Sequence, residues 1–395
     1  MNHVDTAVVG GGLLGCATAW QLARAGSRVL LLEKDQINRH ASGQNAGSLH
    51  FQLEYRMVEH GDDAARAAAR ALPLHLDAVR SWAAVEDELG EPCGVSRHGG
   101  LMLAETPAEV AVLDRKAALE RRYGLAVEVL SGADLHALAP YLAPTVRAAG
   151  FVPDEGKANP RLVTPALARA AVRYGTVLHT GCRVTGLSRR NGYWELSTRA
   201  GADGGPGGTY RADTVVLAGG VWTAELAGMA DVRLPVFPVG LTMSATARTA
   251  PLLPHLIQHV GRRLSVKQTA EGTVLIGGGW PAKLVSRSGR TDLEVNPELR
   301  YESLTGNLAA ARVVPALLDL PLIRTWTGMT TLTPDQLPLL GAVPRRPGLF
   351  VATGGSAFTL GLTYARLLAG MVLTGTADPS VADYSPARFG ALNFA

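Results

Sequence analysis

Apolar and polar residues follow a distinct order over the first 33 residues of the chain. Val4–Val9 is a short apolar run typical of a buried strand, and Leu13–Ala25 carries apolar residues at helical spacing. Gly26 comes next and is typical of the residue that ends a helix. Arg28–Leu32 is a second apolar run. Strand, helix and strand in this order predict a βαβ unit, whose two strands are parallel.

The pattern becomes helical over a long stretch between about residues 60 and 124. Runs rich in alanine, leucine and arginine predict helices there, and the strand-like stretch Gly99–Leu103 lies between them. Arg161–Tyr174 repeats the helical pattern. The character of the chain therefore changes after the βαβ unit.

Strand patterns return after this helical stretch. Thr176–Thr198 alternates around Asn191–Gly192, a pair typical of a tight hairpin turn. The glycine-rich run Gly201–Gly208 has the composition of a loop tip and predicts a surface turn. Thr214–Ala218 is a continuous apolar run, which predicts a buried parallel strand, and Gly219–Gly220 ends it.

The last third of the chain repeats the opening arrangement. Pro235–Gly279 has the pattern of strands and loops, and Leu299–Leu318 has the pattern of a helix. Leu349–Thr353 predicts a last short strand, followed by a glycine turn and a helix through about Leu373. The chain thus begins and ends with strand, glycine turn and helix.

These patterns predict an α/β protein of two lobes. A chain of 395 residues also favours two lobes, because a single compact core rarely grows so large. We expect a discontinuous nucleotide-binding lobe assembled from residues 1–75, 150–235 and 320–395. We expect a second, substrate-binding α+β lobe from residues 76–149 and 236–319, with a mixed or antiparallel sheet.

The composition is that of a soluble globular enzyme, with 47% hydrophobic and 18% charged residues. The net charge is +4 and no basic block occurs, so we expect no nucleic-acid partner. No apolar run approaches the ~18 residues of a membrane span, and the first strand leaves no room for a signal peptide. Cys16, Cys93 and Cys182 have no metal-like spacing and no disulfide framework, which favours a reducing compartment. We expect a cytoplasmic protein without a metal site.

A dinucleotide-binding motif stands between the first strand and the first helix. Gly10–Gly15 matches G-x-G-x-x-G, in which Gly10 allows the tight turn, Gly12 the close approach of a pyrophosphate, and Gly15 the packing of helix on strand. Glu33 ends the second strand, where an acidic side chain meets ribose hydroxyls and disfavours the 2′-phosphate of NADP. We assign cofactor contacts here to Gly10, Gly12, Leu13, Leu14, Gly15, Glu33 and Lys34.

The next segment of small and polar residues indicates which cofactor is bound. Ala41–Gly47 (ASGQNAG) lies one short turn after Glu33 and suits a backbone that runs beside a pyrophosphate and a ring system. It resembles the SGxNAG segment of the D-amino-acid oxidase superfamily of FAD enzymes, in the branch of glycine oxidase, sarcosine oxidase and D-amino-acid dehydrogenase. The resemblance assigns FAD contacts to Ser42, Gly43, Gln44, Asn45, Ala46 and Gly47.

Four further segments resemble the same superfamily, in the same order along the chain. They are Cys182–Leu187, Val215–Trp222, Trp326–Gly341 (with WTGM and TPD) and Leu349–Ser356. The resemblance therefore covers nearly the whole chain. It assigns further FAD contacts to Val184, Ala218, Gly219, Trp222, Gly354, Gly355, Ser356 and Thr359.

The resemblance implies a Rossmann-like FAD lobe of the glutathione-reductase type and a second lobe that meets the flavin ring. It implies oxidation of the C–N bond of a small amino or imino acid, with hydride transfer to flavin N5 and later hydrolysis of the imine. The cofactor carries this chemistry, and the protein supplies placement and electrostatics. We expect the FAD to be non-covalent, because no cysteine falls in a segment that resembles an attachment site.

The chain departs from the superfamily at one informative position. Relatives of the glycine oxidase type carry an arginine that holds the substrate carboxylate, where this chain has Thr330. A hydroxyl cannot replace bidentate arginine recognition. The wording of this region is more similar to β subunits of multi-subunit sarcosine oxidases and of proline or opine dehydrogenases. Partner subunits or a separate electron acceptor are therefore expected possibilities, and so is an FAD-carrying electron-transfer or assembly subunit without its own substrate site.

Candidates for the substrate face are His50, Lys267 and Gln268. His50 follows the flavin-loop segment, although a lone histidine is more often a structural hydrogen-bonding residue. Lys267 and Gln268 are neighbours on an expected strand of the second lobe, so alternation turns only one of them inward. The resemblance to sarcosine oxidases assigns a lysine near the flavin to the reaction with oxygen, while a solvated strand lysine is the alternative.

Overall fold

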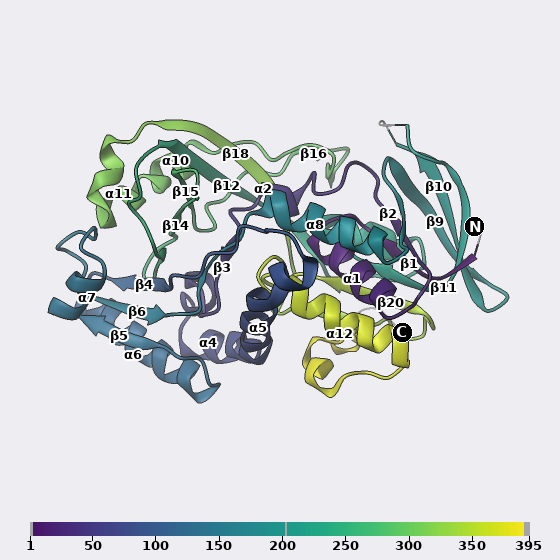
Figure 1. The fold of residues 1–395 in the computed structure, drawn as a ribbon, viewed down its shortest axis with the longest axis horizontal. Helices are drawn as coiled ribbons and strands as arrows, with labels where there is room; N and C mark the ends of the chain where they lie inside the picture. The colour runs from purple at the N-terminus through teal and green to yellow at the C-terminus, as the bar shows by residue number, and fades with distance from the viewer. Residues whose placement is uncertain (1–2, 202–203, 391–395) are drawn as a thin grey trace.

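The structure, a computed structural model, describes residues 3–201 and 204–390 and confirms the α/β class. Two eight-stranded sheets dominate the fold, one at the right of Figure 1 and one at the left. Among the described residues, no helix is long and apolar enough to cross a membrane.

The first sheet is assembled from segments far apart in the chain. Its path runs through β19 (Leu339–Ala342), β20 (Leu349–Thr353), β11 (Gly208–Leu217), β1 (His3–Val9), β2 (Val29–Leu32) and β8 (Val177–His179). The strands from β20 to β8 are parallel, and β19 is antiparallel to β20. The hairpin of β9 (Cys182–Arg190) and β10 (Tyr193–Ala200) joins this sheet through β11.

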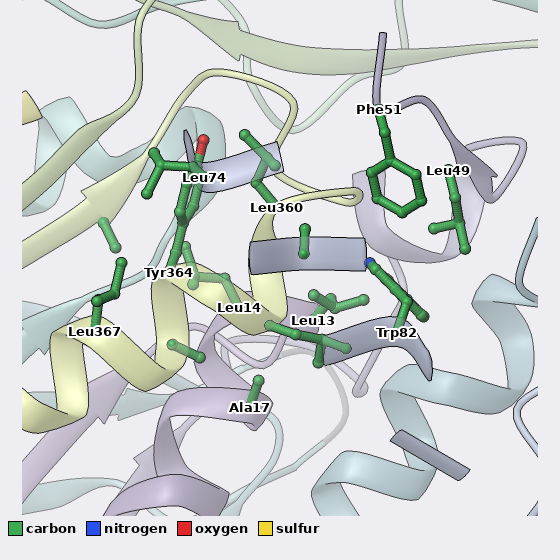
Figure 2. Packing of buried hydrophobic residues seen from close by; sticks show 14 of the residues in the cluster. Leu13, Leu14, Ala17, Leu49, Phe51, Leu74, Trp82, Leu360, Tyr364 and Leu367 are labelled. Atoms are coloured by element: carbon green, nitrogen blue, oxygen red, sulfur yellow. The ribbon is translucent and has the colours of Figure 1, made fainter. Parts of the chain in front are cut away.

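The alternation of side chains along β1 explains how both faces of this sheet are covered. Val8 packs on one face against helices, whereas Ala7 and Val9 pack on the other against the β9–β10 hairpin and its neighbours. The helical cover consists of α1 (Leu13–Arg24), α5 (Leu72–Leu89), α8 (Pro160–Arg173) and α12 (Gly361–Thr374). Figure 2 shows Leu13 and Leu14 of α1 in this core with Trp82 of α5 and Tyr364 of α12.

The second sheet belongs to the other lobe. Its strands are, in spatial order, β18 (Leu322–Leu332), β12 (Phe237–Arg248), β15 (Thr273–Gly277), β14 (Ser265–Gln268), β13 (Leu256–His259), β4 (Gly100–Ala104), β6 (Ala148–Val152) and β5 (Glu128–Ser131). Only the β13–β4 pair is parallel, so the sheet is mixed. One face carries its own apolar core, which includes Val266 of β14.

The remaining elements connect or flank the two sheets. The helices are α2 (Ala41–Gln44), α3 (Tyr55–Val58), α4 (Asp62–Ala69), α6 (Pro107–Arg122), α7 (Gly132–Leu138), α9 (Thr223–Gly228), α10 (Tyr301–Asn307) and α11 (Ala309–Val313), with 3-10 turns at Gly220–Trp222, Pro315–Asp319, Pro379–Tyr384 and Pro386–Phe389. The two-stranded ribbons are β3 (Ser48–Leu49) with β7 (Gly156–Lys157), and β16 (Ser286–Arg287) with β17 (Arg290–Thr291).

Most sequence-predicted elements are confirmed, with two corrections. The single helix expected over Leu299–Leu318 is wrong: the segment forms α10, α11 and a 3-10 turn. Pro315 cannot continue an α-helix, because it lacks the N–H and its ring clashes with the preceding turn. The strand expected at Thr214–Ala218 begins earlier, at Gly208, because it also pairs with β10. The loop expected over 201–208 lies partly outside the described residues.

The sheets also refine the expected division into lobes. β6 and β18 pair within the second sheet, although the expected boundaries place residues 150–152 and all of β18 in the nucleotide lobe. We propose the expected division with this difference: the second lobe also takes residues 148–152 and 322–332.

Two buried carboxylates fix the segment Phe51–Leu53, which follows the flavin-loop region. Glu155 accepts from the amides of Phe51 and Gln52 at 2.7 and 2.9 Å and from the Gln52 side chain at 2.8 Å. Glu120 accepts from the Leu53 amide at 2.6 Å and forms an ion pair with the buried Lys116. Burial raises the pKa of Glu155 to about 7 despite these hydrogen bonds.

This raised pKa predicts a pH dependence of folding stability. The folded protein binds a proton at Glu155 that the unfolded chain releases near pH 4.5, so the stabilisation is present below that pH and is lost as the pH rises to about 7. The lost free energy of unfolding is on the order of 2–3 kcal/mol. In Glu155→Gln, urea unfolding measured from pH 5 to 8 should lose this slope, whereas the exposed Glu128→Gln should keep it. An unchanged slope in Glu155→Gln would contradict the assignment.

Candidate active site

The turn after β1 is closed by direct contacts between main-chain atoms. Gly10 has φ +117°, and a Cβ there would lie 2.4 Å from the carbonyl oxygen of Ala218. A Cβ at Gly15 would lie 1.8 Å from the carbonyl oxygen of Gly10. At Gly12 a Cβ would meet only the side chain of Ser42, whose hydroxyl would lie 2.9 Å away. Gly10 and Gly15 are therefore required by the fold itself, while Gly12 leaves its amide side open to a ligand.

An elongated cavity of about 350 Å³ begins at this turn and runs to the second sheet. Of the residues assigned to FAD from the sequence, those that line it are Gly10, Gly12, Leu14, Glu33, Lys34, Ser42, Gln44, Asn45, Ala46, Val184, Ala218, Gly219, Trp222 and Gly354. Those outside its lining are Leu13, Gly15, Gly43, Gly47, Gly355, Ser356 and Thr359. Several of these hold the wall: the Leu13 amide donates to Ser42 Oγ at 2.9 Å, and Thr359 Oγ1 donates to the Ser48 carbonyl at 3.2 Å.

Glu33 marks one end of the cavity. Its side chain is buried, and its two oxygens accept from the amides of Gly11 at 2.5 Å and Asp35 at 2.8 Å. Val184 and Cys182, at the start of β9, line the same cavity. This end therefore offers a fixed carboxylate for ribose hydroxyls and an apolar strand for the adenine.

A segment of the second lobe reaches this end and was not found from the sequence. Glu294 accepts from Lys34 Nζ at 2.9 Å, from Arg183 at 2.9 Å and from Trp222 Nε1 at 3.0 Å. Lys34 Nζ also lies 4.1 Å from the centre of a Trp222 ring. Hydrogen bonds from Arg183 and Lys34 lower the pKa of Glu294 to about 2, against the opposing effect of burial. Glu294 thus ties three residues of the cavity wall to the other lobe.

The opposite end of the cavity lies under the second sheet. Leu241 and Met243 of β12, and Trp326 with residues 328–331 of β18, face it from that sheet. Gly354, Ala357 and Phe358 face it from the first lobe. Trp326 Nε1 donates to the Gln44 carbonyl at 2.8 Å and so joins the sheet to the end of α2. Thr330 lines this end, and none of these described residues that surround it is an arginine.

The three substrate-face candidates do not line this cavity but lie in two different environments. His50 is buried and its Nε2 lies 3.3 Å from Ser265 Oγ of β14; burial lowers the pKa of His50 to about 4, so the ring is neutral. Lys267 shares the strand face of Ser265, opposite Val266, and is buried as well. Burial, and then the charge of Lys157, hold the pKa of Lys267 well below its ordinary value.

Gln268 serves the structure of the second lobe instead of the substrate face. Its Oε1 accepts from the amides of Leu252 and Leu253 at 2.7 and 3.0 Å. Its Nε2 donates to the carbonyl of Ala250 at 2.8 Å and of Gly272 at 3.1 Å. Strand alternation therefore turns Lys267 inward and uses Gln268 to hold a loop, a choice that the sequence left open.

These features fit one extended dinucleotide cofactor. A buried ribose-type carboxylate, an open glycine turn at the start of a helix and a wide end roofed by a second lobe follow one another along a single cavity. A nicotinamide-binding βαβ unit alone would not need the residues around Gly354. The fold and the cavity together define a two-lobe flavoprotein of the FAD-binding class.

Comparison with known proteins agrees with this class. The family described as "FAD dependent oxidoreductase" matches residues 5–371, and the chain belongs to this family. FAD is its cofactor. The glycine oxidase of Geobacillus kaustophilus (strain HTA426) is 29% identical over 372 residues, which cover 90% of this chain and 88% of that protein. A protein of Rhizobium meliloti named as one of the subunits of an opine oxidase is 27% identical over 400 residues, covering 99% of each.

Some relatives are much longer than this chain. The mitochondrial dimethylglycine dehydrogenase of Mus musculus is 26% identical over 415 residues, which cover 98% of this chain but only 44% of that enzyme. The chain thus spans less than half the length of that relative. Among solved structures, the crystal structure of glycine oxidase from Geobacillus kaustophilus matches with a TM-score of 0.83 at 26% identity, covering 98% of this chain and 99% of that one.

Removing the carboxylate of Glu294 should weaken FAD binding. Glu294→Gln leaves Lys34 and Arg183 without their charge partner and loosens Trp222, so FAD should dissociate about 3- to 10-fold faster. The rate can be followed by the rise of free-flavin fluorescence after dilution. Glu298→Gln is the matched control, because Glu298 pairs with Lys283 on the surface of the same segment. Equal dissociation rates for both variants would contradict the role of Glu294.

Proposed function

We propose that this protein oxidises the C–N bond of a small amino or imino acid. The observation that carries the proposal is the wide cavity end, where β12 and β18 roof the place left for the flavin ring. The names of the relatives, which include a glycine oxidase and an opine oxidase, support the same substrate class. Bound FAD would accept a hydride from the substrate C–H bond, and water would hydrolyse the resulting imine.

The residues at the roof set the environment of the reaction. Leu241, Met243 and Met329 present apolar side chains, and they would exclude water from the reacting carbon and its nitrogen. A neutral amine is a better hydride donor than an ammonium ion, and an apolar roof favours the neutral form. A strong general base is not needed in such a site.

The substrate carboxylate needs a cation, because Thr330 cannot supply one. We propose Lys267, with Lys157 beside it, for this role. Lys267 is 3% exposed, and its pKa is lowered by burial and by the like charge of Lys157, so an anion between the two amines would restore the proton on Lys267. The neutral His50, held against the Lys267 strand through Ser265, would line the same place.

Purified protein tests the proposal directly. Its spectrum should show bound flavin, and acid precipitation should leave the pellet colourless, since Cys182 lines the adenine end of the cavity, and Cys16 and Cys93 lie outside the lining. Anaerobic addition of sarcosine, glycine, D-amino acids, L-proline, hydroxyproline isomers or opines should bleach the flavin for at least one compound. Peroxide production in air then separates an oxidase from a dehydrogenase.

The alternative is an FAD-carrying electron-transfer or assembly subunit without its own substrate site. The match to a protein named as one subunit of an oxidase, and the lack of the arginine at Thr330, favour it. If no compound bleaches the flavin, alone or with a co-purified partner, the amino-acid oxidation is wrong and this alternative holds. A stable co-purifying partner with substrate bleaching would instead support a hetero-oligomeric dehydrogenase.

Lys267→Met should separate two roles of the lysine. If Lys267 holds the substrate carboxylate, the dissociation constant from anaerobic bleaching should rise about 10- to 100-fold, since a charge-assisted hydrogen bond is lost. If it promotes reaction with oxygen instead, reoxidation should slow and substrate binding should stay unchanged. Lys267→Arg should restore much of the binding, and Lys283→Met is the surface control. Normal binding in Lys267→Met would contradict the carboxylate role.

A further inference from the structure

A second cavity, of about 200 Å³, lies directly beside the cofactor cavity. The start of α3, helix α4, the first turn of α5, the 334–338 loop and the first turn of α12 surround it. One glycine pair separates the two spaces, because Gly354 lines the cofactor cavity and Gly355 lines the second one. Nothing in the proposed oxidation uses this space.

Two side chains in its lining carry polar atoms without partners. Tyr364 is fully buried, and its hydroxyl has no hydrogen-bond partner in the described part of the chain. His75 is 1% exposed, and its Nδ1 is likewise unpartnered among those residues. Burial lowers the pKa of His75 to about 4 and raises that of Tyr364, so the ring is neutral and the hydroxyl keeps its proton. Unsatisfied buried polar groups are rare and call for an explanation.

The Tyr364 hydroxyl also lies against the glycine pair. A Cβ built at Gly355 would come within 2.8 Å of the hydroxyl oxygen and within 3.3 Å of Pro338. In Figure 2 the ring of Tyr364 rises from α12 with its oxygen at the far end. The polar end of the second cavity is therefore the end that adjoins the cofactor.

The guanidinium of Arg56, which lies in the lining, is already neutralised. Arg56 donates to Glu54 Oε1, to Ser356 Oγ and to Gln336 Oε1, each at 3.1 Å. The charge of Arg56 helps to lower the pKa of Glu54 to about 2, so this pair is ionised and its charges cancel. The cavity therefore favours a neutral ligand over an anion.

The walls are apolar and flat. Ala64, Ala67 and Ala68 lie at helical spacing on α4 and offer only methyl groups, and Pro334 and Pro338 face the cavity from the loop. Such walls suit the faces of a planar ring. An oxygen on that ring could accept from Tyr364, and its reduced hydroxyl form could also donate to His75 Nδ1.

We propose that the second cavity binds a small neutral aromatic acceptor of the quinone class. The proposal rests on the amino-acid oxidation for its reductant. That oxidation releases two electrons and two protons, which reduce the two carbonyl groups of the quinone to the hydroxyls of a hydroquinone. The acceptor would leave as the hydroquinone, and the amino-acid site would stay on the other side of the glycine pair.

Direct binding to the holoenzyme tests the site without any amino acid. Isothermal titration calorimetry with menadione should give saturable binding of one molecule per chain. Ala68→Phe, which fills the space beside α4, should weaken this binding at least tenfold, and Tyr364→Phe about three- to tenfold. Ala83→Phe is the matched control, because Ala83 is exposed on α5 and outside the lining. Flavin content and circular dichroism confirm that each variant is folded.

The outcomes separate this site from the proposed function. Absence of saturable menadione binding, or binding that Ala68→Phe leaves unchanged, would overturn the site whether or not an amino acid bleaches the flavin. If menadione binds as expected but reoxidises substrate-reduced enzyme no faster in wild type than in Ala68→Phe, the acceptor role is wrong. Ferricenium, which needs no pocket, should reoxidise wild type and Ala68→Phe equally.

Discussion

The contact between main chains at the turn after β1 is the constraint on which the rest of the structure depends. Gly10 approaches the carbonyl of Ala218 at the end of β11, and Gly15 approaches the carbonyl of Gly10. Any side chain at either glycine would push α1 away from the sheet. Because α1 stays close, its first amides open onto the cavity, and strands from the beginning, middle and end of the chain meet there.

The second lobe contributes by placing side chains over the far end of the same cavity. Trp326 joins β18 to the end of α2, and Glu294 joins the loop after β17 to Lys34 and Trp222. The cavity is therefore held by both lobes at both ends. In the same way, Glu155 and Glu120 hold the chain just after His50, so the candidate substrate face is fixed by buried hydrogen bonds. Such groups can tune a reaction because they do not reorganise during it.

The glycine turn at residues 354–355 gives two adjacent spaces with different chemistry. On one side the lining is long, glycine-rich and carries the buried Glu33, which suits a dinucleotide. On the other it is short, lined by alanines and proline, and carries the neutral Tyr364 and His75. An enzyme that takes electrons from one small molecule and delivers them to another needs such a separation, since the two reactants must not compete for one site.

The sequence alone determined the nucleotide lobe, its glycine turn, the acid at Glu33 and the family resemblance. These features depend on local conformation and on the period of apolar residues, which neighbours in the chain encode. It could not choose between Lys267 and Gln268, nor find Glu294, whose partner Lys34 is 260 positions away. Only the tertiary structure decided these, together with the second cavity and the break in the helix expected over 299–318. The reason is physical: side-chain direction and burial depend on which distant strands and helices pack together, and no local pattern carries that information.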